Sequence, residues 1–195
     1  ISFELLQDSA FNVEQFVSRK LGERLGRGAN AKLTIGTGVG QPQGIVPAAG
    51  LGKTAAAQAA LVADELIDLQ HSVNQAYRRS PMCRWMFADT TLAVIRKMKD
   101  GQGNFLWQMG DVRANAPDVI LGKAYSVNDD VPVIAAGNRS IVFGDFSRYT
   151  VRKVGSPLIG TVRERFWPKV GMAGLIRYDG RLLDTNAVKA LRQAA

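Results

Sequence analysis

The order of helix-like and strand-like segments most constrains what this chain can fold into. Before residue 104, apolar side chains recur mainly at helical spacing, with short extended pieces between them. From residue 104 to 178, short β-rich segments alternate with Gly, Pro, Asn and Asp. Helices segregated from strands favour an α+β fold with a mostly antiparallel sheet over alternating βαβ units.

The first expected helix covers residues 12–26. Its apolar side chains form one stripe at helical spacing, and Asn12 is a candidate N-cap. Gly26 and Gly28 can end a helix because glycine adopts the left-handed cap conformation without strain. The sequence therefore predicts that the helix stops there, and that residues 32–35 are extended.

Three further helices are expected. A Gly-rich loop over residues 36–52 leads to a second helix at about 55–70, for which Thr54 is a candidate cap. The third helix is expected over residues 90–99, after an Asp-Thr cap. A final short helix is predicted at 186–193.

The strand predictions begin with Cys83–Phe87. The later strand predictions are Phe105–Trp107, Val119–Leu121, Tyr125–Val127, Val133–Ala135, Ser140–Phe143, Tyr149–Val154 and Val170–Tyr178.

Composition narrows the classes of function. The chain has 195 residues, enough for a real core, and no apolar run approaches the ~18 residues that span a bilayer. One cysteine, Cys83, excludes an internal disulfide and a cysteine-cluster metal site. The net charge of +8 favours polyanionic or acidic partners. Because the basic residues are scattered, a solvated surface or subunit contacts are favoured over a dedicated DNA-binding motif.

Two Gly-rich segments resemble phosphate-binding loops, and both depart from the pattern. After Gly36–Gly40 the chain continues with Gln and Pro, and no helix is expected to open there. Gly50–Thr54 contains Gly-Lys-Thr, but the glycine required five positions earlier is Pro47. Proline has no N–H to donate to a phosphate. Nucleotide binding through Gly50–Thr54 therefore remains a weaker alternative.

The remaining polar candidates fit structural roles better than chemistry. His71 is the only histidine and is expected at a helix C-terminus, while Cys83 is expected to be a small buried hydrophobe. The carboxylates within residues 64–68 are expected on a solvated helix face, and residues 128–130 in a turn. We therefore expect no catalytic, cofactor-binding or metal-binding residue, no cofactor, and a protein that is not an enzyme.

Aromatic side chains are expected to fill the core, because they do not interleave with Lys and Arg in a pattern typical of RNA binding. The aromatic residues in question are Phe105, Trp107, Phe143, Phe146, Tyr149, Phe166 and Trp167.

Five blocks, in this order, resemble the major capsid proteins of tailed bacteriophages, which have the Hong Kong 97-type shell fold. The blocks are Ser2–Ser9, Gly36–Gly44, Trp85–Trp107, Gly144–Tyr149, and Arg177–Gly180 followed by Asn186-Ala-Val.

The resemblance implies a peripheral domain with a spine helix and an axial domain with a mostly antiparallel sheet flanked by helices. The peripheral domain would comprise residues 1–50 and part of 140–180. The axial domain would comprise 51–140 and 181–195. In the family an N-arm and an extended loop precede the segment that begins here at Ile1, so both are expected to be absent and the peripheral domain to be partial.

For function, the resemblance implies a structural subunit of an icosahedral phage or prophage capsid, a component of the virion made in the cytoplasm of a bacterial host. The subunit would self-assemble into pentamers and hexamers around double-stranded DNA, held by nonspecific electrostatics. A scaffold protein and a maturation protease are further candidate partners, and a membrane is not. Without the N-arm and extended loop, monomers or small rings are expected in place of closed shells.

Two alternatives stay open beside the capsid interpretation. The same fold would serve the shell of a bacterial, encapsulin-like nanocompartment, whose contents are protein instead of DNA. The other is the nucleotide-binding enzyme using Gly50–Thr54.

Overall fold

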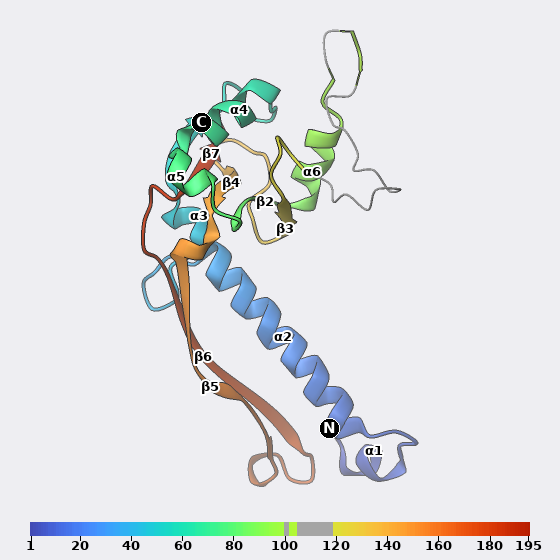
Figure 1. The fold of residues 1–195 in the computed structure, drawn as a ribbon. Coiled ribbons are helices and arrows are strands. Elements are labelled where there is room, and N and C mark those ends of the chain that lie inside the picture. Colours follow the sequence, from blue (N-terminus) through green and yellow to red (C-terminus); the bar gives the residue numbers. More distant parts are fainter. Residues whose placement is uncertain (100–101, 105–118) are drawn as a thin grey trace.

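The computed structural model describes residues 1–99, 102–104 and 119–195, and it divides into a sheet domain and a long arm (Figure 1). The arm consists of helix α2 (Val13–Ile35) and the hairpin of β5 (Tyr149–Val162) and β6 (Gly171–Leu182). The helix and the hairpin run side by side away from the sheet domain. The N-terminus lies at the distal end of the arm, and the C-terminus lies in the sheet domain.

The other elements are short. The helices are α1 (Phe3–Asp8), α3 (Ile45–Ala48), α4 (Ala63–Ser72), α5 (Gln75–Arg78), α6 (Asp89–Arg96) and the 3-10 helices η1 (Phe146–Arg148) and η2 (Glu164–Phe166). The strands are β1 (Gly50–Thr54), β2 (Cys83–Phe87), β3 (Tyr125–Val127), β4 (Arg139–Asp145) and β7 (Val188–Arg192).

The sheet domain is built on five strands in the order β1-β7-β4-β2-β3. The inner pairs β7–β4 and β4–β2 are antiparallel, whereas the outer pairs β1–β7 and β2–β3 are parallel. The sheet is thus mixed around an antiparallel centre. The expected α+β class is confirmed by the antiparallel centre of the sheet and by the antiparallel hairpin of β5 and β6, although β2, α6 and β3 at one edge form a parallel βαβ arrangement.

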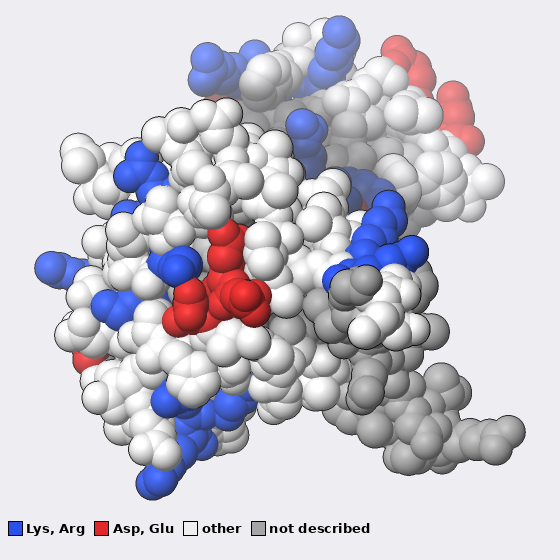
Figure 2. Space-filling model, turned by 90° about the horizontal axis from the view of Figure 1, so that it is seen from above, with Lys and Arg blue, Asp and Glu red and all other residues white. Residues whose placement is uncertain are grey.

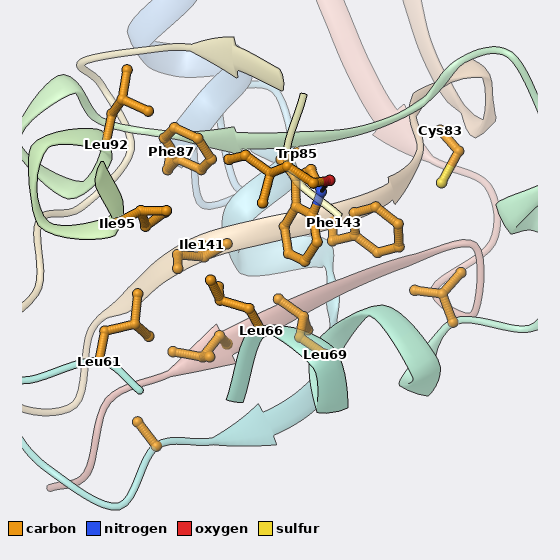
Figure 3. Close-up of a cluster of buried hydrophobic side chains, with 14 residues drawn as sticks. Leu61, Leu66, Leu69, Cys83, Trp85, Phe87, Leu92, Ile95, Ile141 and Phe143 are labelled. Atoms are coloured by element: carbon orange, nitrogen blue, oxygen red, sulfur yellow. Dashed lines mark hydrogen bonds between the residues drawn. The ribbon is translucent and has the colours of Figure 1, made fainter. Parts of the chain in front are cut away.

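Alternation along β2 and β4 sends side chains to the two faces of the sheet. Trp85, Phe87, Ile141 and Phe143 are fully buried on the face that α4 and α6 cover (Figure 3). Trp85 and Phe143 are opposite one another in the register, and their ring centroids lie 4.3 Å apart. From α4, Leu66 reaches the same cluster. This face holds the larger of the two cores.

The second core lies on the opposite face of the same strands. Val142 of β4 and Val188 of β7 are fully buried there, on the face of the sheet that packs against α3. Ile45 and Val46 from α3 complete the cluster. The guanidinium of Arg139 donates to the carbonyls of Val46, Pro47 and Ala49, at 3.0, 2.9 and 2.8 Å, so it satisfies the carbonyls at the end of α3.

Helix α2 is longer than predicted. It begins as expected after Asn12, whose side chain accepts from the Gln15 N–H at 2.9 Å, but it continues through Gly26 and Gly28 to Ile35. Residues 32–35 are therefore helical, and the prediction that they are extended was wrong. The helix continues because Leu33 extends its packing stripe against β6, as the position of Gly180 beside Leu33 shows.

The second predicted helix starts late because its expected first turns are used elsewhere. Gly50–Thr54 is strand β1, which pairs in parallel with β7, so Thr54 lies in a strand and caps no helix. Helix α4 begins at Ala63. Its N-terminus is held by the buried carboxylate of Glu65, which accepts from the N–H groups of Val62 and Ala56 at 3.1 and 2.7 Å.

The C-terminal helix predicted at 186–193 was wrong, since Val188–Arg192 forms strand β7 between β1 and β4. Its residues favour helix locally, but pairing on both sides and burial on both faces outweigh propensity. The strands at Cys83–Phe87 and Tyr125–Val127 are confirmed with the predicted bounds.

The predictions Ser140–Phe143, Tyr149–Val154 and Val170–Tyr178 are confirmed as parts of the longer strands β4, β5 and β6, although β6 begins at Gly171. Three other short predictions are not confirmed as such. Val119–Leu121 contributes one isolated bridge, Ile120 to Lys123, and Val133–Ala135 is irregular. Phe105–Trp107 lies outside the described residues, and α6 ends at Arg96 instead of residue 99. Within the described part of the chain, no helix combines the length and the apolar character needed to cross a membrane.

Gly22→Ala should stabilise the protein. A Cβ at this exposed position in α2 would meet no atom within 4 Å, and alanine loses less backbone entropy than glycine on folding. The expected gain is about 0.5–1 kcal/mol in the free energy of unfolding, measured by urea denaturation. The matched control is Gly174→Ala, whose Cβ would lie within 3.0 Å of Leu21 and Leu25 and should destabilise the arm.

Phe143→Ala should be among the most damaging changes in the sheet domain. The ring is fully buried and packs on Trp85, so its removal leaves a cavity and is expected to lower stability by about 3–5 kcal/mol. Phe11→Ala is the control, because the Phe11 side chain is 62% exposed. Similar losses in urea denaturation for the two variants would contradict the assignment of the core.

Candidate assembly surfaces

The arm exposes most of its surface. Thirteen of the 14 residues of β5 are exposed, and within the described residues β5 pairs with β6 and with no other strand. A two-stranded hairpin is marginally stable at best in water, so packing against α2 is what supports this one.

Helix α2 covers one face of the hairpin through β6. Gly174 lies against Leu21 and Leu25, and Gly180 lies against Leu33, so that side chains larger than hydrogen at either position would meet the helix. Residues of β6 at alternate positions are more exposed, and they lie on the face that points away from α2. We call this second face the outer face of the hairpin.

The outer face changes character along its length. Near the middle of the arm, Leu158 and Leu175 are directly opposed across the strands and are 67% and 57% exposed. Closer to the sheet domain, Arg152 is opposed to Asp179. The outer face is therefore apolar toward the tip of the arm and charged toward its base.

Apolar side chains also gather at the distal end of the arm. Phe166 and Trp167, at the turn of the hairpin, are 48% and 80% exposed. The N-terminus is tied to this turn, since the Ile1 ammonium donates to the Val170 carbonyl at 2.9 Å and the Val170 N–H donates to the Ile1 carbonyl at 2.8 Å. We call the exposed apolar residues of this end the tip patch: Phe3, Leu5, Phe11, Phe16, Phe166 and Trp167.

The tip patch was missed from the sequence. Phe166 and Trp167 were expected in the core, and for these two residues the prediction was wrong, whereas Phe143 is in the core as expected. A usable signal was present: the two aromatics are flanked by Arg165 and Lys169. A segment with charged residues on both sides of a short apolar stretch is more typical of the surface than of a core.

At the base of the arm, Tyr149 joins three segments. Its hydroxyl lies 2.7 Å from the carbonyl oxygen of Gln43 and 3.2 Å from that of Leu33. The Gln43 N–H donates to the Gly180 carbonyl at 3.0 Å. Burial of the hydroxyl, with a smaller contribution from Asp179, raises the pKa of Tyr149 to about 12. The hydroxyl therefore remains a neutral donor throughout the physiological pH range.

Charge is distributed unevenly between the parts of the molecule. Residues 149–182 contain seven Lys and Arg against two Asp and Glu, so the hairpin is strongly basic. Seen from above, Figure 2 shows scattered basic side chains, a compact group of acidic side chains near the centre, and a few other acidic side chains toward the edges of the view. On α4, Asp64 and Asp68 are exposed, and Asp68 accepts from Lys53 at 2.6 Å.

The Gly-rich segments serve the fold. Gly50–Thr54 is an extended strand, so its N–H groups do not form a loop that could surround a phosphate, and Lys53 is paired with Asp68. The loop at residues 36–44 folds back on itself, with the Gly44 N–H donating to the Gly36 carbonyl at 2.8 Å. Together with Arg177 and Tyr178 of β6, this loop borders an open cavity of about 680 Å³.

The polar residues considered individually in the sequence have structural positions, as follows. His71 is in the last turn of α4, as expected, with Nδ1 3.3 Å from the Arg78 guanidinium. Cys83 is buried, as expected, and burial raises the pKa of its thiol. Glu65 corrects the expectation of a fully solvated carboxylate group, because it is buried. Among the described residues, no group of three or more His, Cys, Asp or Glu side chains could hold a metal ion.

The turn at residues 128–130 has a structural role. The Asn128 amide donates to Thr34 Oγ1 at 2.9 Å and accepts from the Asn30 amide at 2.9 Å, which ties α2 to the sheet domain. Asp129 accepts from the Asp89 N–H at 3.2 Å at the start of α6. The expectation of a turn is thus confirmed.

This chain was compared with a family model, with solved structures and with curated proteins. The model of the Phage capsid family matches residues 1–192. A structure described as the capsid of an empty GTA particle, computed with C5 symmetry, is 28% identical with a TM-score of 0.89, over 100% of this chain and 70% of that chain. A comparison with curated proteins gives no match.

More distant structures share the fold alone. The Mycobacterium phage Cain structure is 14% identical with a TM-score of 0.68, over 100% of this chain and 70% of that chain. The SrpI encapsulin complex from Synechococcus elongatus PCC 7942 is 13% identical with a TM-score of 0.69, over 98% of this chain and 70% of that chain. The expected Hong Kong 97-type fold is thereby confirmed. With the family match over nearly the whole length, this chain belongs to the phage capsid family and is a structural subunit of a capsid.

Proposed function

We propose that the subunit assembles into five- and six-membered capsomers of an icosahedral shell, and that the arm joins neighbouring subunits through the tip patch. The observation that carries this proposal is the exposure of Phe166 and Trp167 at the end of a projecting arm. In this proposal the arm belongs to the peripheral domain expected from residues 1–50 and part of 140–180. The sheet domain corresponds to the axial domain expected from 51–140 and 181–195.

The energetics of burial support the tip patch as a contact. Burying an exposed Trp or Phe is favourable by roughly 25 cal/mol per Å² of apolar surface, and aromatic side chains dominate interface energies. Many modest contacts of this kind add up in a closed shell, since each subunit is held by several neighbours at once. Symmetric closure then limits the assembly to a finite particle.

The basic hairpin supports double-stranded DNA as the enclosed partner. Seven Lys and Arg against two Asp and Glu in residues 149–182 produce an attraction to phosphates that needs no base readout. The expected interaction is nonspecific and depends on salt. This partner distinguishes the capsid interpretation from an encapsulin-like shell with protein contents.

Light scattering across a concentration series, with electron microscopy of the same fractions, tests the proposed assembly. Rings with five or six members are the expected result. A closed dimer or a monomer at every concentration would count against capsomer formation by this chain, while leaving the family assignment intact.

Trp167→Ser should weaken association without unfolding the subunit. The indole is 80% exposed, so the free energy of unfolding should change by less than about 0.5 kcal/mol. Loss of an interface aromatic should raise the concentration for half-assembly about tenfold or more in light scattering. Val39→Ser removes another exposed apolar side chain, away from the arm tip, and should leave assembly unchanged.

Arg152→Gln with Arg177→Gln should weaken DNA binding and reduce its dependence on salt. Loss of two phosphate contacts should lower the slope of log K against log salt by about 1.8 in magnitude. The control is Arg79→Gln with Lys97→Gln in the sheet domain, which removes the same charge. Equal slopes for the two double variants, measured by fluorescence anisotropy, would show that the hairpin is not the main contact.

A further inference from the structure

We propose that a set of hydrogen bonds at the base of the arm fixes the direction in which the arm leaves the sheet domain. We call this set the junction lock, and its members are Tyr149, Thr34 and Asn128. The inference concerns the shape of one subunit. It therefore stands or falls independently of the proposed capsomers and DNA.

The need for a lock follows from the chain path. The backbone passes between arm and sheet domain three times, through residues 36–44, 146–148 and 183–187. Each connection is a loop or a single 3-10 turn, and hinges in proteins are a few such residues that absorb changes in φ and ψ. The connections alone therefore leave the direction of the arm weakly determined.

Tyr149 holds the base of the hairpin to the end of α2. It is the first residue of β5, directly after the connection at 146–148. Its hydroxyl proton is shared by the carbonyls of Gln43 and Leu33, and its ring lies against Gly180 of β6, where a Cβ would overlap the hydroxyl. One side chain thus contacts α2, the loop at 36–44 and both strands of the hairpin.

Asn128 holds α2 to the sheet domain. It follows β3 directly, and its amide donates to the hydroxyl of Thr34, which is 2% exposed. The same side chain accepts from Asn30, one turn earlier on α2. Hairpin, helix and sheet are therefore linked in sequence, with Tyr149 as the first link and the Asn128–Thr34 pair as the second.

Small rotations at the base matter because the arm is long. The 23 residues of α2 span roughly 34 Å at 1.5 Å per residue, so a rotation of about 10° displaces the tip by about 6 Å. A displacement of that size would move the tip patch out of contact with a partner. Hydrogen bonds with defined directions restrict such rotations more sharply than apolar contacts do.

Tyr149→Phe tests the lock by removing the hydroxyl and keeping the ring. Spin labels at Arg19→Cys on α2 and Asp64→Cys on α4 would report the distance between arm and sheet domain by pulsed electron resonance. Cys83 stays unlabelled because it is buried. We expect the distance distribution of the Tyr149→Phe variant to be about twofold broader than that of the unsubstituted chain.

Tyr178→Phe is the matched control. The Tyr178 hydroxyl also contacts a backbone carbonyl, that of Gly28 at 3.5 Å, but neither residue belongs to a connection between arm and sheet domain, whereas Tyr149 bonds to Gln43 of the connection at 36–44. This variant should keep a narrow distribution, even if its melting temperature falls as much as that of Tyr149→Phe. Equal widths for the two variants would overturn the proposal, since a purely structural role predicts a change in stability alone.

Thr34→Val provides an independent second variant, should Tyr149→Phe fail to give a folded protein by circular dichroism. It keeps the shape of the side chain and removes the acceptor for Asn128. A broadened distribution is again expected. A distribution as narrow as that of the unsubstituted chain, in a folded Thr34→Val protein, would exclude the second link and with it the lock.

Discussion

The close approach of α2 to β6 is the contact on which the arm depends. It is possible because Gly174 and Gly180 present no side chain to the helix, so that Leu21, Leu25 and Leu33 pack directly on the strand backbone. Without this backing, two strands with little buried surface would not hold their shape in water. The exposure of the tip patch and of the basic hairpin therefore depends on this contact.

The sheet domain, unlike the arm, is stabilised by cores on both faces of its sheet. Strands β4 and β7 occupy the middle of the sheet, where both faces are covered, by α4 and α6 on one side and α3 on the other. Alternation along β4 sends Phe143 to one core and Val142 to the other, which fixes the register strongly, because a slip by one residue would exchange them. The domain is therefore a rigid support from which an exposed arm extends.

Elements whose conformation depends on neighbouring residues in the sequence were predicted, and elements that depend on distant parts of the chain were not. Cys83–Phe87 and the start of α2 were foreseen because periodicity and the Asn12 cap are local signals. The strand at Val188–Arg192 was not, because its neighbours in the sheet lie far away in the chain. The exposure of Trp167 was not predicted, because an aromatic side chain on a surface and one in a core have the same hydrophobicity, although the flanking Arg165 and Lys169 argued against burial.

The hairpin has a consequence for the subunit before assembly. In a sheet of two strands, each strand has an edge with free N–H and C=O groups, and in this protein those edges are 14 and 12 residues long. Such edges readily pair with identical edges of other chains, which leads to aggregation. The like charges of Arg152, Lys153 and Arg177 repel a second hairpin at close range, and Pro157 interrupts the β5 edge. The basic charge of the arm thus also opposes pairing between the hairpin edges of two subunits.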